Sequence, residues 1–273
     1  MNRIAFAALA LALLGAAAPA PRHGEAAAAD RAGNRMAAFV MITRTQNAHG
    51  APDPLALYCS TDRRWCARLR QGASGGPWIL ELAEGANAPR RIEIPAPEEE
   101  WIRLQVWPRI VIEASGAAIV GVQRVDDGAN PQGEWHKETL TLVRAAPAPA
   151  ALVQVLEVPT WAYNGLYACP HRGDRARRFG ACIDKALYTA RLTLDPATQA
   201  GRPRFRFAAL ARTWPAHNVL ERELDRQIPL RRADIRWAVD PECTYRLRIA
   251  WDAAHGEYRA DGQFPRCPDY FGF

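Results

Sequence analysis

The sequence predicts a mainly β protein with a sandwich- or barrel-like architecture, divided into two β subdomains. Three observations support this fold class. Short runs of alternating polar and apolar residues recur along the chain, turn-rich pieces separate them, and a single segment has the spacing of an amphipathic helix. Many short strands at such intervals are typical of sandwiches and barrels.

The first 29 residues have the pattern of a secretory signal peptide. Arg3 gives the charged start, an apolar run extends from Ile4 to Ala18, and small residues offer cleavage points between positions 20 and 29. The run is too short to span a bilayer, and no later apolar stretch reaches the roughly 18 to 20 residues that spanning requires. We therefore expect an exported protein, periplasmic or secreted, whose mature chain has no transmembrane segment.

Strand-like runs follow in both halves of the mature chain. They are residues 39–45, 78–82, 91–94, 102–106, 110–113, 118–125, 138–143, 152–158, 187–194 and 204–207. The pieces 84–87 and 126–131 are rich in Gly, Asn and Asp, so we predict turns there. Residues 216–227 are predicted to form the one helix, because their apolar residues have helical spacing and Pro229 ends the run.

An alanine- and proline-rich segment, residues 145–150, divides the mature chain. Proline stiffens such a segment, and we expect it to link a first β subdomain at 36–144 to a second at 151–273. Each half soon reaches a Leu-Tyr pair that precedes two cysteines close together in the sequence. A tandem repeat is one interpretation of this similarity, and a loop inside a single domain is the other.

Six cysteines in an exported chain predict three disulfides. A strand-like alternation covers residues 243–251, and a hairpin centred near His255 would place opposite each other residues whose numbers sum to about 510. Positions 243 and 267 meet that condition. The local pairs favoured by spacing are Cys59 with Cys66, Cys169 with Cys182, and Cys243 with Cys267.

Composition excludes several classes of protein. Hydrophobic residues make up 49% of the chain and charged residues 23%, which are ordinary values for a globular protein. The net charge of +6 implies mild attraction to anionic surfaces and falls well short of a nucleic-acid-binding signature. The histidines have no metal-ligand spacing, and neither a P-loop nor a dinucleotide fingerprint occurs. We therefore expect no metal, no cofactor and no nucleic-acid partner.

Ser74 is the one candidate nucleophile that a motif suggests. The segment from Gly72 to Pro77 resembles the serine motif of chymotrypsin-like proteases and also fits the G-x-S-x-G pattern. In those proteases the histidine and the aspartate precede the serine, whereas only His23 and His49 lie upstream of Ser74. The residues after Pro77 alternate as a strand does, while a nucleophile elbow leads into a helix. The sequence favours a hairpin turn, with Ser74 as a weak catalytic candidate.

The segment from Cys169 to Cys182 is the candidate binding site. It carries a single aspartate, Asp174, within a loop that a disulfide would close. Its four arginines are Arg172, Arg175, Arg177 and Arg178. Guanidinium groups suit the phosphates and carboxylates of a cell envelope. The alternative is a solvated basic loop, since only two of the 35 basic residues are lysines and arginine is common throughout this chain.

The nine tryptophans raise a carbohydrate-binding interpretation, because flat aromatic rings stack on sugars. Trp78, Trp237 and Trp251 lie in apolar strand patterns, so we expect them in the core. The tryptophans near strand ends or turns, where exposure is more plausible, are Trp101, Trp107, Trp135 and Trp161.

Together these observations predict a non-catalytic binding or interaction module of the bacterial envelope that is held by three disulfides. Its expected partners are anionic envelope components or another exported protein, with the loop at residues 169–182 as the contact surface. The alternative is an exported hydrolase whose catalytic residues converge only in three dimensions.

Overall fold

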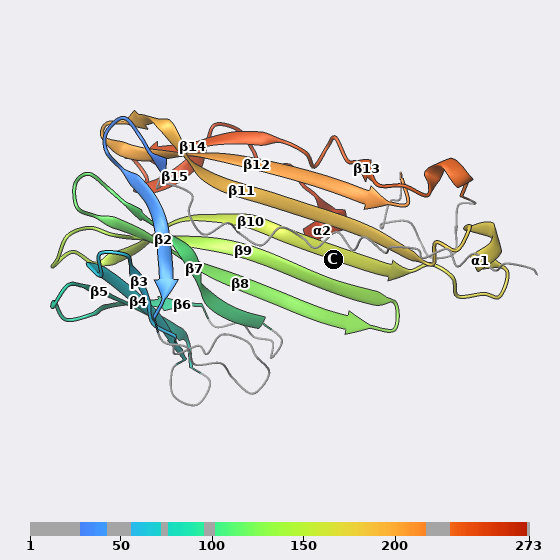
Figure 1. Ribbon diagram of the computed structural model, residues 1–273, viewed down its shortest axis with the longest axis horizontal. Coiled ribbons are helices and arrows are strands. Elements are labelled where there is room, and N and C mark those ends of the chain that lie inside the picture. Colours follow the sequence, from blue (N-terminus) through green and yellow to red (C-terminus); the bar gives the residue numbers. More distant parts are fainter. Residues whose placement is uncertain (1–27, 43–55, 72–75, 96–101, 217–229, 272–273) are drawn as a thin grey trace, which may run out of the picture.

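A computed structural model describes residues 28–42, 56–71, 76–95, 102–216 and 230–271. The predicted signal peptide up to residue 27, Ser74, and the predicted helix beyond Ala216 lie outside these described residues. The described chain is mainly β, as the alternating patterns predict. Figure 1 shows a long, curved sheet in which strands β8 to β12 extend to one end of the molecule, where α1 lies.

Strands make up most of the described chain. They are β1 (Ala28–Ala29), β2 (Arg35–Met41), β3 (Tyr58–Ser60), β4 (Trp65–Gln71), β5 (Trp78–Glu84), β6 (Arg90–Ile94), β7 (Ile102–Ile112), β8 (Ala118–Asn130), β9 (Gly133–Ala145), β10 (Leu152–Tyr167), β11 (Ile183–Gln199), β12 (Arg202–Trp214), β13 (Ala238–Val239), β14 (Arg246–Asp252) and β15 (Glu257–Ala260). The helical pieces are α1 (Asp174–Arg177), the 3-10 turn η2 (Arg232–Asp234) and α2 (Pro268–Phe271). Within the described residues, these helical pieces are far too short to cross a membrane.

The strands join into one open antiparallel sheet with β15 and β6 at its two ends. Its order is β15-β14-β12-β11-β10-β9-β8-β7-β2-β3-β4-β5-β6, while β1 pairs with β2 and β13 pairs with β12. Most neighbours in space are also neighbours in sequence, so short turns suffice to connect them. The chain thereby builds the sheet largely as a series of hairpins.

Alternation along β12 shows why these residues form strands. Every second side chain from Pro203 to Thr213 is buried, and the residues between them are partly or fully exposed. Successive strand side chains point to opposite faces, so this sequence buries one face and leaves the other in water. By contrast, the first five residues of β8 are all buried. A strand that is buried on both faces has a continuous run of apolar residues, as the start of β8 does.

That double burial arises because two hydrophobic cores lie on opposite faces of the same strands. The N-terminal core packs β3 to β6 against one face of β7, β8 and β9, and includes Trp65, Val120 and Val143. The C-terminal core packs the other face of these strands against β10, β11, β12, β14 and β15, and includes Ile119 and Tyr188. Strands β7, β8 and β9 therefore contribute side chains to both cores.

The predicted linker, residues 145–150, lies at the turn between β9 and β10. These two strands pair with each other from Ala145 and Leu152 to Gly133 and Leu166. Arg90 of β6 also donates hydrogen bonds to carbonyl oxygens in this turn, 2.8 Å in the case of Ala150. The division of the chain into two subdomains at this point stays a prediction.

All three predicted disulfides are present. Cys59 is bonded to Cys66, Cys169 to Cys182, and Cys243 to Cys267. The β14–β15 hairpin pairs residues whose numbers sum to 509, such as Asp252 with Glu257, so the predicted register was close. The strand itself was predicted too long, because β14 begins only at Arg246.

Two further predictions from composition were wrong. Residues 126–131 were expected to form a turn, but β8 continues to Asn130 because its polar residues have cross-strand partners, and the turn comes only at residues 131–132. Asp126, for example, accepts a hydrogen bond of 3.2 Å from the indole N–H of Trp135. Trp237 was expected in the core and is 42% exposed; its ring instead lies against the Arg212 guanidinium, 5.7 Å from it.

Candidate functional site

The loop that joins β10 to β11 forms one end of the molecule, beyond the long strands (Figure 1). Its base is closed by the Cys169–Cys182 disulfide, whose Cα atoms are 5.0 Å apart. A backbone hydrogen bond of 2.9 Å from Ala168 N to Cys182 O continues the β10–β11 pairing to that point. We call residues 169–182 the tip loop.

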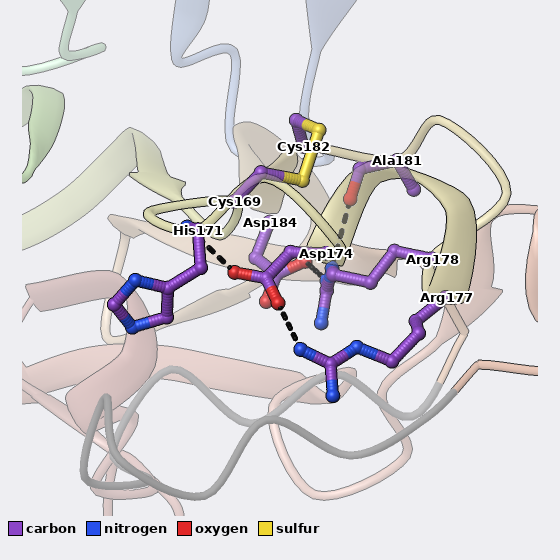
Figure 2. Close-up of a disulfide and its surroundings, with 8 residues drawn as sticks. All are labelled: Cys169, His171, Asp174, Arg177, Arg178, Ala181, Cys182 and Asp184. Atoms are coloured by element: carbon purple, nitrogen blue, oxygen red, sulfur yellow. Dashed lines mark hydrogen bonds and ion pairs between the residues drawn. A yellow bond between two sulfur atoms is a disulfide. The ribbon is translucent and has the colours of Figure 1, made fainter.

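Asp174 organises the inside of the tip loop (Figure 2). Its side chain is only 1% exposed. It accepts a hydrogen bond of 2.8 Å from the backbone N–H of His171 and one of 2.6 Å from the guanidinium of Arg177. The His171 N–H and then the charge of Arg177 hold the pKa of Asp174 below its ordinary value. Asp174 therefore stays ionised and holds the start of α1 in place.

Arg178 is also committed to the interior of the tip loop. It is 5% exposed, its Nε donates to the carbonyl oxygen of Ala181 at 2.9 Å, and its Nη2 is ion-paired with Asp184 at the start of β11. Burial raises the pKa of Asp184 to about 6, against the opposing effect of Arg178. A guanidinium buried in this way is positioned to stabilise the loop and is out of reach of an external ligand.

The other two predicted arginines have a different environment. Arg172 and Arg175 are exposed, and within the described residues neither forms an ion pair or a side-chain hydrogen bond. Two aromatic rings lie near them in sequence, Phe179 at 55% exposure and Tyr167 at 50%. Phe179 has a φ of +49°, which is uncommon for a bulky residue. The tip loop thus presents two cations and exposed aromatic surface.

The Ser74 candidate lies outside the described residues, but the strands on either side of it are described. Gln71 at the end of β4 is paired with Trp78 at the start of β5. The chain therefore passes from one strand directly into its neighbour, whereas a nucleophile elbow passes from a strand into a helix. The antiparallel pairing of β4 and β5 is what a hairpin turn between them requires.

A second group of polar residues was missed in the sequence, and it gathers around His136. The Nδ1 atom of His136 contacts the carboxylate of Asp127, and its Nε2 lies 3.0 Å from a Glu138 oxygen. Trp161 packs edge-to-face with the imidazole at a centroid distance of 4.5 Å. The hairpin register supplies the signal that could have revealed this group, since Asp127 and His136 are directly paired on β8 and β9. The predicted turn at 126–131 concealed that pairing.

The histidine pairs do not form a hydrolytic site within the described residues. Both ring nitrogens of His136 are committed to carboxylates, so neither is free to accept a proton from a nucleophile. His255 binds Asp252 at 2.6 Å, and in the described part of the chain no serine, threonine or cysteine is bonded to either imidazole. A triad needs a nucleophile on one nitrogen and an orienting group on the other.

The described residues also contain no cluster of His, Cys, Asp and Glu that could hold a metal ion. Each cysteine of the tip loop is part of a disulfide and is unavailable as a thiolate ligand.

The chain matches no protein-family model, no curated protein and no solved structure.

Proposed function

We propose that this chain is an exported, non-catalytic binding module of the bacterial envelope, and that the tip loop is its contact surface for anionic groups. One observation carries the proposal. Of the four arginines in the tip loop, Arg177 is bonded to Asp174 inside the loop and Arg178 to Asp184 just after it. Arg172 and Arg175 are exposed to water. The first two maintain the shape of the loop and the second two remain available to a partner.

Rigidity makes these two cations more effective. Binding costs free energy whenever a loop must become ordered, so a loop already fixed in shape loses less on contact. The disulfide, the buried Asp174 and the buried Arg178 each restrain the tip loop before any partner arrives. The loop also lies at the end of the long strands (Figure 1).

Magnitudes limit the kind of partner. A hydrogen bond to a charged group contributes about 1.5 to 3 kcal/mol, so two arginines supply about 3 to 6 kcal/mol, close to millimolar affinity. Burial of the Phe179 ring adds about 1.5 to 3 kcal/mol. A single small anion would therefore be held weakly. A surface with many anionic groups is the better partner, because repeated contacts raise the effective affinity.

Co-sedimentation with phospholipid vesicles, with and without an anionic lipid, tests the proposal. We expect the wild-type protein to sediment with anionic vesicles at low salt and to be released at high salt, since salt screens exposed charges. The double variant Arg172→Ala, Arg175→Ala should stay in the supernatant. The matched control is Arg124→Ala, Arg191→Ala, which removes the same charge from exposed positions on β8 and β11.

Equal sedimentation of the tip variant and the wild type would contradict the proposal. Equal loss in the tip variant and the control would also contradict it, because net charge alone would then explain the binding.

A further inference from the structure

The His136 group belongs to a larger face of the sheet that the tip loop does not include. Directly opposed residues of antiparallel strands have their side chains on the same face. Asp127, His136 and Tyr163 are opposed in this way across β8, β9 and β10, and Glu138 is opposed to Trp161. We call these five residues and the sheet surface around them the His136 face.

This face is open to solvent where it continues over β11, β12 and β13. Leu210 lies in line with Trp161 through Thr189, and Val239 lies in line with Tyr163 through Leu187 and Arg212. Leu210 is 38% exposed and Val239 is 56% exposed. These two side chains extend the face beyond its aromatic rings.

Two aromatic rings form the centre of the His136 face. Trp161 and Tyr163 are two positions apart on β10, so both rings are on one side of the strand. Their centroids are 6.3 Å apart and their planes are inclined by 30°. The edge-to-face contact with His136 fixes the orientation of the indole. The result is a shallow aromatic surface that is only half-buried.

Hydrogen-bonding groups border these rings. The side-chain amide of Gln105 donates to Gln123 at 3.2 Å, and Gln123 donates in turn to the Glu138 carboxylate. On the other side, the Tyr163 hydroxyl donates to Glu134 at 3.1 Å. Burial and the neighbouring Glu134 carboxylate raise the pKa of Tyr163 to about 12. The phenol therefore stays neutral and keeps its hydroxyl as a donor.

We propose that the His136 face binds a neutral glycan chain laid across the strands. Pyranose rings have apolar C–H faces that stack on Trp and Tyr, and hydroxyl edges that bond to carboxylates and amides. The face presents both kinds of group side by side. Asp127 is ion-paired with Arg103, while Glu138 and Glu134 add two further carboxylates beside the rings. The border of the rings therefore has an excess of negative charge that disfavours an acidic polysaccharide.

Sheet geometry supports an extended ligand. Adjacent strands are about 4.8 Å apart, close to the length of one pyranose unit in a β-linked chain. A glycan that crosses β9, β10 and β11 therefore meets a new strand with each sugar. The site is separate from the tip loop, which offers cations to anions, and each can be tested without the other.

Isothermal titration with chito-oligosaccharides and cello-oligosaccharides tests this inference. We expect the wild-type protein to bind at least one of these neutral glycans, and polygalacturonate not to bind at the same face. Trp161→Ala should weaken binding by about ten-fold or more, a loss of roughly 1.4 kcal/mol. The control Trp135→Ala removes the neighbouring tryptophan on the opposite side of β9 and should bind as wild type does. Arg172→Ala, Arg175→Ala should also bind normally.

A second measurement on the wild-type protein guards against loss of folding in the variants. In NMR titrations, the indole N–H resonance of Trp161 should shift on glycan addition, while that of Trp135 should not. Failure of every neutral oligosaccharide to bind would overturn the inference. So would wild-type affinity in Trp161→Ala, or a shift at Trp135 without one at Trp161.

Discussion

Four arginines of one loop illustrate how carboxylate partners divide the roles of identical side chains. Arg178 needs the Asp184 carboxylate, which follows the disulfide in sequence, and Arg177 needs Asp174 one turn earlier. Arg172 and Arg175 have neither kind of partner within the described residues. The sequence identified all four as one basic group, because residue type alone does not report which guanidinium has a carboxylate partner. Only the folded loop shows that Arg177 and Arg178 stabilise it, while Arg172 and Arg175 are available to a partner.

Arg178→Gln is expected to destabilise the protein by about 3 to 5 kcal/mol, because it leaves Asp184 buried without its partner. The matched variant Arg172→Gln changes an exposed side chain and should alter the free energy of unfolding by less than about 0.5 kcal/mol. Urea unfolding of the two variants checks the difference. Equal effects would show that Arg178 is not enclosed as described.

The pH dependence of Arg178→Gln follows from the same pair. Asp184 already has its pKa raised to about 6 by burial, and removal of the guanidinium raises it further. A carboxyl group whose folded pKa exceeds its unfolded value stabilises the fold below the unfolded pKa and loses that contribution as pH rises through the folded pKa. The stability gap between the variant and the wild type should therefore narrow as the pH falls from neutrality towards about 4. A gap that widens over this range would contradict the assignment.

At the level of elements, the tip loop depends on its disulfide more than the sheet does. Removing the Cys169–Cys182 cross-link as Cys169→Ser, Cys182→Ser should cost about 3 kcal/mol in the chain-entropy model. We expect faster hydrogen exchange throughout the tip loop and unchanged protection in β8 and β9. The corresponding removal of Cys59–Cys66 is the control, because that pair joins two strands far from the tip loop. Unchanged exchange in the tip loop would show that its other contacts suffice.

Most strands were predictable because alternation along the chain reports directly on burial of one face. The disulfides were predictable because each cysteine is close in sequence to its partner, at separations of 7, 13 and 24 residues. The failure at residues 126–131 has a specific cause. Polar residues such as Asp126 to Asn130 look like a turn in sequence, but cross-strand partners stabilise them as a strand. The same error concealed the group around His136, because Asp127 and His136 come together only when β8 pairs with β9.

At the scale of the whole molecule, one set of central strands separates two cores. Ile119 belongs to the C-terminal core and Val120 to the N-terminal core, although they are adjacent in β8. A change at either position therefore affects a different half of the protein through the same strand. The apolar run in β8 was visible in the sequence. The two cores that cover its two faces were not, because the residues that pack there are remote in the chain.

The tip loop and the His136 face lie on the long strands of this sheet. The C-terminal core includes Ala162 and Tyr188, which are next to the His136 face on β10 and β11. The tip loop extends beyond the sheet, as Figure 1 shows, and its inner contacts keep Arg172 and Arg175 turned outward. We propose that this loop meets the anionic surface first.

Hydrogen exchange of the wild-type protein, free and bound to anionic vesicles, tests that claim most directly. The account predicts added protection across residues 170–181 on binding, with no comparable change in β3 to β6. Protection that is absent from the tip loop, or that is greatest in β3 to β6, would contradict it.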